Sequence, residues 1–266
     1  MTPSSSPAGA TSPAPSSTAL LKTLTALALV VAFCAAAFAW YERRHPRVFI
    51  QTVPQDASLR DKFLAAYYST DVWERTYWMG VPSLQTPTDN WSMQEILWEI
   101  KPDFVIETGT YNGGTSLYYA ALLSIIGDKG KVITVDIDDS RIGEASQRKL
   151  WKERVEFIKG SSVDKAVSDR IRREVEGHSV VVTLDALHTR DHVFKELEIY
   201  SQLVPVGSYL VVQDTSVGHP ILADAGPGPM EAVQDFLKTH DNFVVDRSRE
   251  KFLLTFYPSG WLKRVR

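Results

Sequence analysis

The sequence predicts an α/β protein whose parallel sheet is covered by helices on both faces. Short apolar runs alternate with helix-like segments over most of the chain after residue 103. The first of these runs leads into a glycine-rich turn and then a helix. Polar residues, most of them acids, follow several of the later runs. Strand–helix alternation of this kind is typical of a parallel sheet with right-handed crossovers.

The glycine-rich turn belongs to segment 103–116, DFVIETGTYNGGTS. An apolar run ends at Glu107, glycines stand at 109, 113 and 114, and a helix-favouring stretch follows. Glycines let the backbone approach a ligand, and a helix N-terminus offers free N–H groups to it. The spacing G-x-x-x-G-G differs from the dinucleotide pattern G-x-G-x-x-G, which disfavours NAD. The turn therefore predicts either a nucleotide-sized pocket or an ordinary strand-to-helix connection.

The remaining elements follow in order along the chain. We expect strands at 104–106, 131–135, 155–158, 179–184 and 207–212, and two late strands at 243–245 and 252–256. We expect helices at 59–68, 93–100, 115–126, 140–151, 163–175, 188–203 and 230–238. Thr88 or Asp89 is the expected cap of the second helix. Segment 216–229, with three glycines and three prolines, is an expected loop and a candidate lid.

Polar groups stand at the ends of the five consecutive strands, where ligands bind in such sheets. They are Glu107, Asp136, Ser162, Asp185 and Asp214. Asp136 follows the second strand, next to the glycine turn, and is therefore expected to accept the two hydroxyls of a ribose rather than to be a solvated turn acid.

The residues that follow two of these strands predict a site for a cation, with a histidine near it. Asp185 and Asp214 offer the oxygen ligands that Mg²⁺ prefers. Such an ion would orient a substrate hydroxyl and lower its pKa. His188 lies about one helical turn after Asp185, so it is either a general base or a capping and packing residue.

Composition excludes some functions. The chain has 266 residues and a formal net charge of −3, so no basic excess indicates nucleic-acid binding. Its single cysteine, Cys34, lies in an apolar N-terminal run. The part after that run therefore has no disulfide and no cysteine metal site.

The N-terminal part predicts a membrane anchor. Residues 1–18 are rich in Ser, Pro, Ala and Thr and are expected to be disordered. Segment 19–41 contains the uncharged apolar run 23–41, which at about 1.5 Å per residue just spans a hydrocarbon core of roughly 30 Å. A cleaved secretory signal and a buried core helix are the alternatives. Three arginines at 43, 44 and 47 outweigh Lys22, so the C-terminal domain of a single-pass protein should face the cytoplasm.

Residues 42–100 are expected to form a linker and a helical lead-in rich in Trp and Tyr, ahead of a ligand-binding domain at 101–266. Most of these aromatic residues are expected to pack against the sheet. The alternative is that they form a wall of the substrate site.

Several long motifs together resemble the cephalosporin hydroxylase family, which includes rhamnosyl O-methyltransferases. They are VPSLQTPTDNW, QEILWEIKPDFVIETGTYNGGTSLYYA, LDALHTRDHVFKELEIYSQLVPVGSYLVVQDT, GPGPMEAV and DRSREKFLLTFYPSGWLKR. The resemblance covers residues 59–264. It implies a Rossmann-like class I methyltransferase fold that binds S-adenosylmethionine, with seven strands of which the last is antiparallel.

The resemblance also implies roles for individual residues. Asp136 would bind the ribose, Ser162 would lie near the adenine, and Asp185 and Asp214 would hold the metal. Gln213 stands where the family usually has Glu, and it can still offer a carbonyl oxygen. The residues expected around the cofactor at the glycine turn are Glu107, Gly109, Thr110, Gly113, Gly114 and Ser116.

Together with the residues above, the resemblance implies a membrane-anchored O-methyltransferase that uses S-adenosylmethionine and Mg²⁺, with His188 as the base and Asp185 at the reacting centre. The acceptor would be a hydroxylated small molecule, glycan or lipid-linked compound, and a homo-oligomer is left open. Gln213 favours a different function, a non-catalytic binding or scaffold protein. A hydroxylase with an iron triad of Asp185, His188 and His192 is disfavoured, because it leaves the glycine turn without a use.

Overall fold

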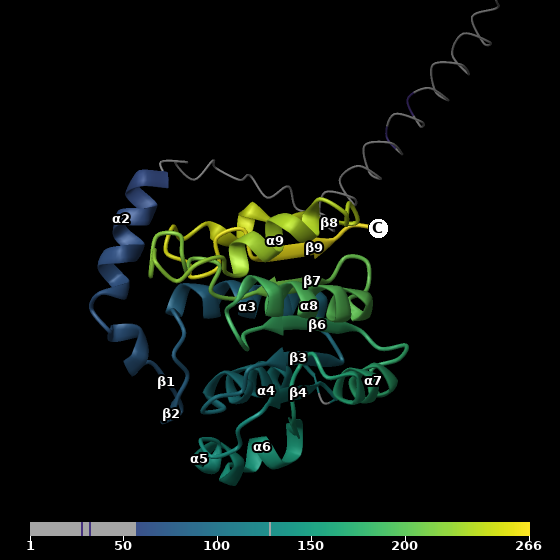
Figure 1. Cartoon of the computed structure of the whole chain (residues 1–266). Coiled ribbons are helices and arrows are strands. Elements are labelled where there is room, and N and C mark those ends of the chain that lie inside the picture. The colour runs from purple at the N-terminus through teal and green to yellow at the C-terminus, as the bar shows by residue number, and fades with distance from the viewer. Residues whose placement is uncertain (1–27, 29–31, 33–56, 128) are drawn as a thin grey trace, which may run out of the picture. The chain divides into compact units, whose positions relative to one another are not determined.

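The computed structural model describes residues 57–127 and 129–266, together with Ala28 and Ala32 (Figure 1). From residue 57 onward the described residues belong to one compact unit. Within the described residues, no helix combines the length and the apolar character needed to cross a membrane. The predicted leader at 1–18, nearly all of the predicted anchor at 19–41 and the arginines used to orient it lie outside the described residues.

A seven-stranded sheet forms the centre of the described part and confirms the predicted α/β class. Its strand order is β5-β4-β3-β6-β7-β9-β8, and all neighbouring strands are parallel except that β9 runs antiparallel to both β7 and β8. The strands are β3 Phe104–Thr108, β4 Lys131–Asp136, β5 Val155–Lys159, β6 Val180–Leu184, β7 Tyr209–Val212, β8 Phe243–Val245 and β9 Trp261–Arg264.

The central strands are buried along most of their length and mostly apolar, because both faces of the sheet are covered. Every residue of β6 is buried, and in β3 only Phe104 is partly exposed. Register brings Ile106 opposite Ile133 on one side and Val182 on the other. Parallel strands buried on both faces show this continuous apolar pattern rather than alternation.

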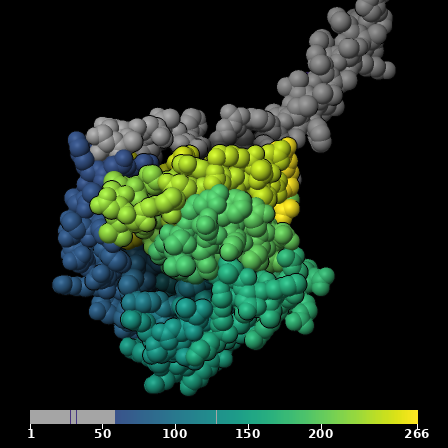
Figure 2. Space-filling view, viewed as in Figure 1, coloured from purple at the N-terminus to yellow at the C-terminus, as the bar shows by residue number. Residues whose placement is uncertain are grey.

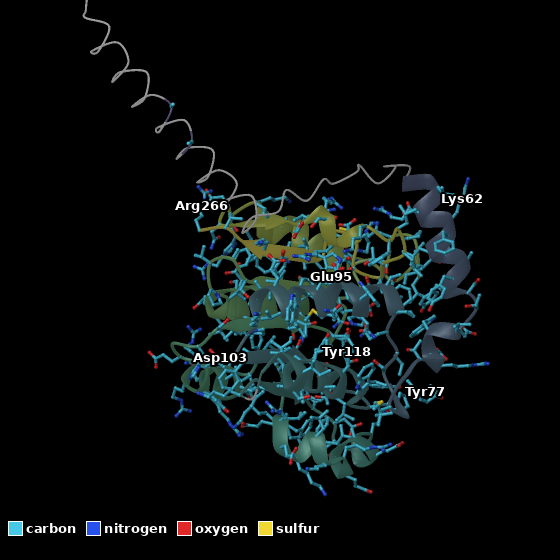
Figure 3. The ribbon with its side chains drawn as sticks, turned by 180° about the vertical axis from the view of Figure 1, so that it is seen from behind. Lys62, Tyr77, Glu95, Asp103, Tyr118 and Arg266 are labelled. Atoms are coloured by element: carbon cyan, nitrogen blue, oxygen red, sulfur yellow. The ribbon has the colours of Figure 1, made fainter. Side chains whose placement is uncertain are left out.

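Helices pack on both faces of the sheet (Figure 1). One apolar cluster joins α7 Lys165–Glu174, α8 Arg190–Tyr200 and α9 Pro229–Leu237 to one face. A second cluster joins α2 Ala57–Tyr68, α3 Pro87–Ile100 and α4 Gly114–Ile126 to the other. Glu95 of α3 and Tyr118 of α4 appear near the middle of the view from behind (Figure 3). The remaining short elements are η1 Val72–Arg75, β1 Tyr77–Trp78, β2 Val81–Pro82, α5 Gly143–Gln147, α6 Lys149–Arg154, η2 Ser201–Leu203 and η3 Arg247–Glu250.

The prediction of a strand at 252–256 was wrong, because the last strand is Trp261–Arg264. Segment 252–256 is apolar, but its Phe256 bonds to and packs against other residues in place of pairing with a strand. The amide of Phe256 donates to Asp89 Oδ2 at 2.8 Å, and the Phe256 ring packs against Tyr68 and Trp73. The chain therefore turns back before it pairs with β7, where Val212 donates to the Gly260 carbonyl at 2.8 Å.

Two of the predicted helices differ most from the structure. The expected helix at 140–151 is two helices, because Arg148 has an extended backbone with ψ of 140°. Helix α3 begins at Pro87, and its cap is Thr86, whose hydroxyl accepts from the amide of Asp89, in place of the predicted Thr88 or Asp89. A proline at the first helical position is favourable there, which places the cap one residue before it.

We expect Gly260→Ala to destabilise the domain by roughly 1–3 kcal/mol, the usual cost of overpacking. A Cβ at Gly260 would lie 2.1 Å from the carbonyl oxygen of Val212 and would push β9 away from β7. Gly143→Ala is the control, since a Cβ there meets nothing within 4 Å. Urea unfolding of both variants tests this, and equal unfolding free energies would contradict it.

Candidate active site

The glycine turn packs closely against two other segments, at Asp185 and at Pro82. Gly109 and Gly113 have backbone φ angles of 84° and 78°, a conformation that residues with a side chain rarely adopt. A Cβ on Gly109 would lie 1.9 Å from the carbonyl oxygen of Asp185, and one on Gly114 would lie 2.2 Å from that of Pro82. The turn needs glycine for packing as well as for backbone geometry, and α4 starts directly behind it with its free N–H groups.

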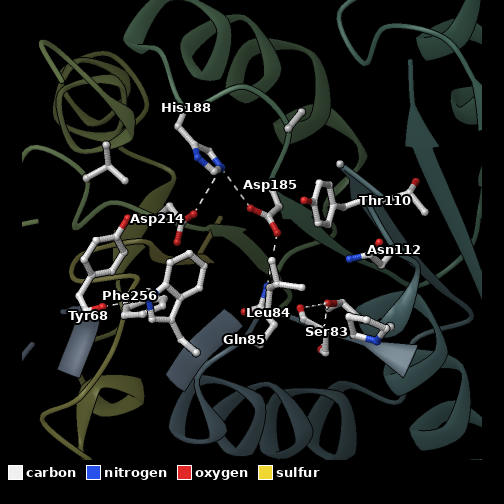
Figure 4. A pocket seen from close by; sticks show the side chains of 18 of the residues that line it. Tyr68, Ser83, Leu84, Gln85, Thr110, Asn112, Asp185, His188, Asp214 and Phe256 are labelled. Atoms are coloured by element: carbon white, nitrogen blue, oxygen red, sulfur yellow. Dashed lines mark hydrogen bonds and ion pairs between the residues drawn. The ribbon is translucent and has the colours of Figure 1, made fainter. Parts of the chain in front are cut away.

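A cavity of about 300 Å³ opens beside this turn, on a face that Figure 2 shows hollowed between the blue N-terminal segment and the green part of the chain. The cavity has three parts (Figure 4). Thr110 and Asn112 of the turn lie at one end, and Tyr68 and Phe256 lie at the other, with the acidic groups between them. Its lining includes Tyr68, Trp73, Ser83, Gln85, Gly109, Thr110, Tyr111, Asn112, Gly114, Thr115, Asp185, His188, Asp214 and Phe256.

Asp185, His188 and Asp214 converge on this cavity. His188 Nε2 lies 3.2 Å from Asp185 Oδ1 and 3.5 Å from Asp214 Oδ2. One possible ligand atom from each residue lies within 4.8 Å of the others. Asp185 follows β6 and Asp214 follows β7, and these strands are neighbours in the sheet. The structure thus brings the predicted metal acids and the predicted base together.

Burial and mutual charge shift the protonation of this group. Burial raises the pKa of Asp185 to about 6, and it also raises the pKa of Asp214. Burial by itself would lower the pKa of His188, but the charges of Asp214 and Asp185 raise it to about 9. The imidazole is therefore more basic than a free histidine and balances part of the buried negative charge.

The three residues fit a divalent cation. Two carboxylates supply the oxygen ligands that Mg²⁺ takes, and they leave room for water and substrate oxygens on the cavity side. The imidazole nitrogen is a ligand that suits transition metals. Asp185 and Asp214 would hold the ion, and His188 is close enough to join them or to stay free as a base.

Gln213, the third predicted metal residue, is placed differently. Its side chain is buried and does not line the cavity. Its Oε1 accepts from Gln85 Nε2 at 2.8 Å and from Tyr257 Oη at 2.6 Å, and its Nε2 donates to Thr183. The carbonyl oxygen that the sequence offered to a metal is thus already bonded to two donors.

Two predicted cofactor residues lie beneath the turn. Glu107 and Ser116 are fully buried, the Ser116 hydroxyl donates to Glu107, and Thr134 donates to the same carboxylate oxygen at 2.7 Å. Asp136 closes the turn from the side, because its Oδ2 accepts from the amides of Thr110 and Tyr111 at 2.9 and 3.0 Å. These acids shape the turn, whereas Gly109, Thr110 and Gly114 face the cavity.

Ser162 lies apart from that cavity lining, with its hydroxyl 3.2 Å from His192 Nε2. His192 also lies 3.6 Å from the buried carboxylate of Glu196. It is absent from the converging cluster of Asp185, His188 and Asp214. The iron triad considered for a hydroxylase is therefore not assembled.

Sequence reasoning missed part of the cavity wall. Gln85 lies in the loop after β2, within the motif VPSLQTPTDNW, but nothing in that motif alone indicates its contact with Asp185. Tyr68, Trp73 and Phe256 face the cavity and also pack on one another. Tyr68 and Trp73 thus pack on their neighbours, as expected for most of the aromatic lead-in, and they also line the cavity, whereas Trp91 and Trp98 are largely exposed.

Comparison with solved structures places the fold among class I methyltransferases. CmcI with Mg and S-adenosylmethionine matches 73% of this chain and 78% of its own, with a TM-score of 0.58 and 21% identity. The CmcI apo-structure gives a TM-score of 0.57 at 21% identity, covering 73% of this chain and 77% of the other.

Sequence comparison defines the family. Rhamnosyl O-methyltransferase of Mycobacterium tuberculosis is 36% identical over 79% of this chain and 86% of its own length. That of Mycobacterium leprae is 35% identical over 78% and 91%. The model for Rhamnosyl O-methyltransferase/CmcI matches residues 70–265, and the chain belongs to this family. It is an S-adenosylmethionine-dependent O-methyltransferase.

We expect the stability of the domain to fall as pH rises, in part because of Glu107. Burial raises its folded pKa from 4.5 to about 8, so its contribution is fully present below the lower value and is lost as pH rises through the upper one. Within this window the dependence is about 1.4 kcal/mol per pH unit. Glu107→Gln should flatten it, since a Gln oxygen can still accept from Ser116 and Thr134.

Unfolding free energies from about pH 5 to about pH 8 test this expectation. Glu176→Gln, at an exposed position, is the control and should keep the wild-type slope. Parallel curves for Glu107→Gln and the wild type would show that Glu107 does not titrate in this range.

Proposed function

We propose that the protein methylates a sugar hydroxyl, assisted by Mg²⁺ held at Asp185 and Asp214. The observation that carries this proposal is the convergence of the two carboxylates and His188 on the cavity beside the glycine turn. A bound cation there would orient the acceptor hydroxyl and lower its pKa.

The glycine turn would bind the cofactor, and the two acids would bind the acceptor. Residues 109–114 and the N-terminus of α4 hold S-adenosylmethionine at one end of the cavity. The acceptor oxygen reaches the methyl carbon from the side of Asp185 and Asp214. The new O–CH₃ bond forms as the S–CH₃ bond breaks, and the cofactor leaves as S-adenosylhomocysteine. Placing the two reactants in line supplies most of the rate gain.

His188 is the proposed proton acceptor. Its ring lines the cavity and lies within 3.5 Å of both carboxylates. The two acids orient the imidazole. A cation bound to them would offset the negative charge that keeps His188 protonated, and the neutral ring could then accept the proton that leaves the hydroxyl. The role of Asp185 and Asp214 is therefore double: they hold the cation and they hold the base.

The aromatic end of the cavity supports a sugar acceptor. Tyr68, Trp73 and Phe256 offer flat apolar surfaces next to the acids. Such faces pack against the C–H groups of a sugar ring, while the carboxylates bind its hydroxyls. The relatives named above are rhamnosyl O-methyltransferases, which favours a rhamnosyl group among sugars. The loop at 216–229 contributes Val217, Ile221 and Leu222 to the wall and is the proposed lid.

We further propose that the apolar run 23–41 anchors the domain on the cytoplasmic side of a membrane, where it would meet a lipid-linked acceptor. The support is the length of the uncharged run and the excess of arginine after it.

We expect Asp185→Asn and Asp214→Asn each to lower methyl transfer by about 10²–10⁴-fold. Each removes a metal ligand and a partner of His188 but leaves the glycine turn intact. Assays would use rhamnosides and other hydroxylated acceptors, and calorimetry would measure S-adenosylmethionine binding with and without Mg²⁺. Asp138→Asn, an exposed acid outside the cavity, is the control. Wild-type activity in either variant would refute the proposed centre.

Deleting residues 1–41 tests the anchor. We expect the full chain to sediment with membranes and to be released by detergent, because the apolar run would be buried in lipid. The shortened chain should stay in the supernatant. A full-length chain found in the supernatant without detergent would exclude an anchor, and a mass loss at the N-terminus would indicate a cleaved signal.

A further inference from the structure

We infer that Gln85 positions the carboxylate of Asp185, and that Gln213 and Tyr257 hold Gln85 in the required orientation. We call Gln85, Gln213 and Tyr257 the amide clamp. The inference rests on the proposed function, because its consequence is the geometry of the cation site at Asp185 and Asp214.

Gln85 links the cavity wall to the sheet. Its Nε2 donates to Gln213 Oε1 at 2.8 Å and lies 3.4 Å from Asp185 Oδ2, as the dashed line in Figure 4 marks. The backbone N–H of Gln85 donates to Thr76 Oγ1 at 3.0 Å, which fixes the backbone of the loop after β2. Gln85 is only 6% exposed, although it lines the cavity.

The other two members of the clamp leave Gln85 little freedom. Tyr257 Oη donates to Gln213 Oε1 at 2.6 Å and also contacts the amide oxygen of Gln85. Gln213 Nε2 donates to Thr183 Oγ1 of β6 at 2.7 Å. Burial raises the pKa of Tyr257 well above its usual value, so its hydroxyl keeps the proton that it donates. Breaking any of these buried bonds would leave a polar group unpaired.

Asp185 is thereby held from two sides. Its Oδ1 faces His188 at 3.2 Å, and its Oδ2 faces Gln85 at 3.4 Å. Contacts to both oxygens restrict rotation of the carboxylate and keep it turned toward Asp214. Groups that orient a ligand in this way affect metal affinity nearly as much as the ligands themselves. Gln213 therefore acts on the cation through Gln85 and Asp185, and not as a ligand.

The test measures Mg²⁺ binding calorimetrically on the full chain with S-adenosylhomocysteine present. Gln85→Leu and Tyr257→Phe should each weaken Mg²⁺ binding about 10-fold or more, within the usual 10–100-fold range for such partners. Affinity for S-adenosylhomocysteine should not change, because the glycine turn is not touched; general loss of structure would lower both affinities. Gln234→Leu, at an exposed position of α9, is the control.

The double variant sharpens the test. If Gln85 and Tyr257 act through one clamp, combining their substitutions should cost little more than Gln85→Leu alone. Wild-type Mg²⁺ affinity in both single variants, or an equal loss of cofactor affinity, would overturn the inference and leave the proposed function standing. Absence of both Mg²⁺ binding and methyl transfer in the wild type would overturn both.

Discussion

The site depends on the contact between Gly109 and the peptide of Asp185. Strands β3 and β6 pair through Thr108 and Leu184, and the amide of Asp185 donates to the Thr108 carbonyl at 2.9 Å. The segments that follow β3 and β6 leave the sheet at this point and leave no space for a side chain on Gly109. A Cβ there would lie 1.9 Å from the carbonyl oxygen of Asp185. The glycine turn and Asp185 therefore line one cavity. A bulkier residue at 109 would separate them.

This arrangement places several carboxylates close together in a poorly solvated part of the protein. Burial raises the pKa of Glu107, Asp185 and Asp214, so each carboxylate tends toward its neutral form unless a partner compensates. Glu107 is compensated by two hydroxyls, and Asp185 and Asp214 are compensated by His188. Removing one partner from such a group leaves an unbalanced buried charge. The same demand for compensation makes the cavity acids suited to a cation.

Local patterns predicted most of the fold and the centre of the site. The five parallel strands, the glycine turn and the acids after β6 and β7 were all visible, because a buried strand and the turn after it are encoded in consecutive residues. The strand at 252–256 was mispredicted, since the Phe256 amide donates to Asp89 and the Phe256 ring packs against Tyr68 in place of strand pairing. Gln85 could not be found, because its role comes from a contact with Asp185 that lies 100 residues away.

The placement of Gln213 shows why a single substitution is hard to interpret from sequence. Judged by the resemblance, Gln213 removes one charge from a metal site. In the structure its side chain is buried, does not line the cavity, and bonds to Gln85, Tyr257 and Thr183. A neutral amide can both donate and accept there, which a carboxylate cannot do. The position is thus occupied by a group that connects β6 to the loop after β2, and the cavity keeps two carboxylates and an imidazole, enough for a cation and a base.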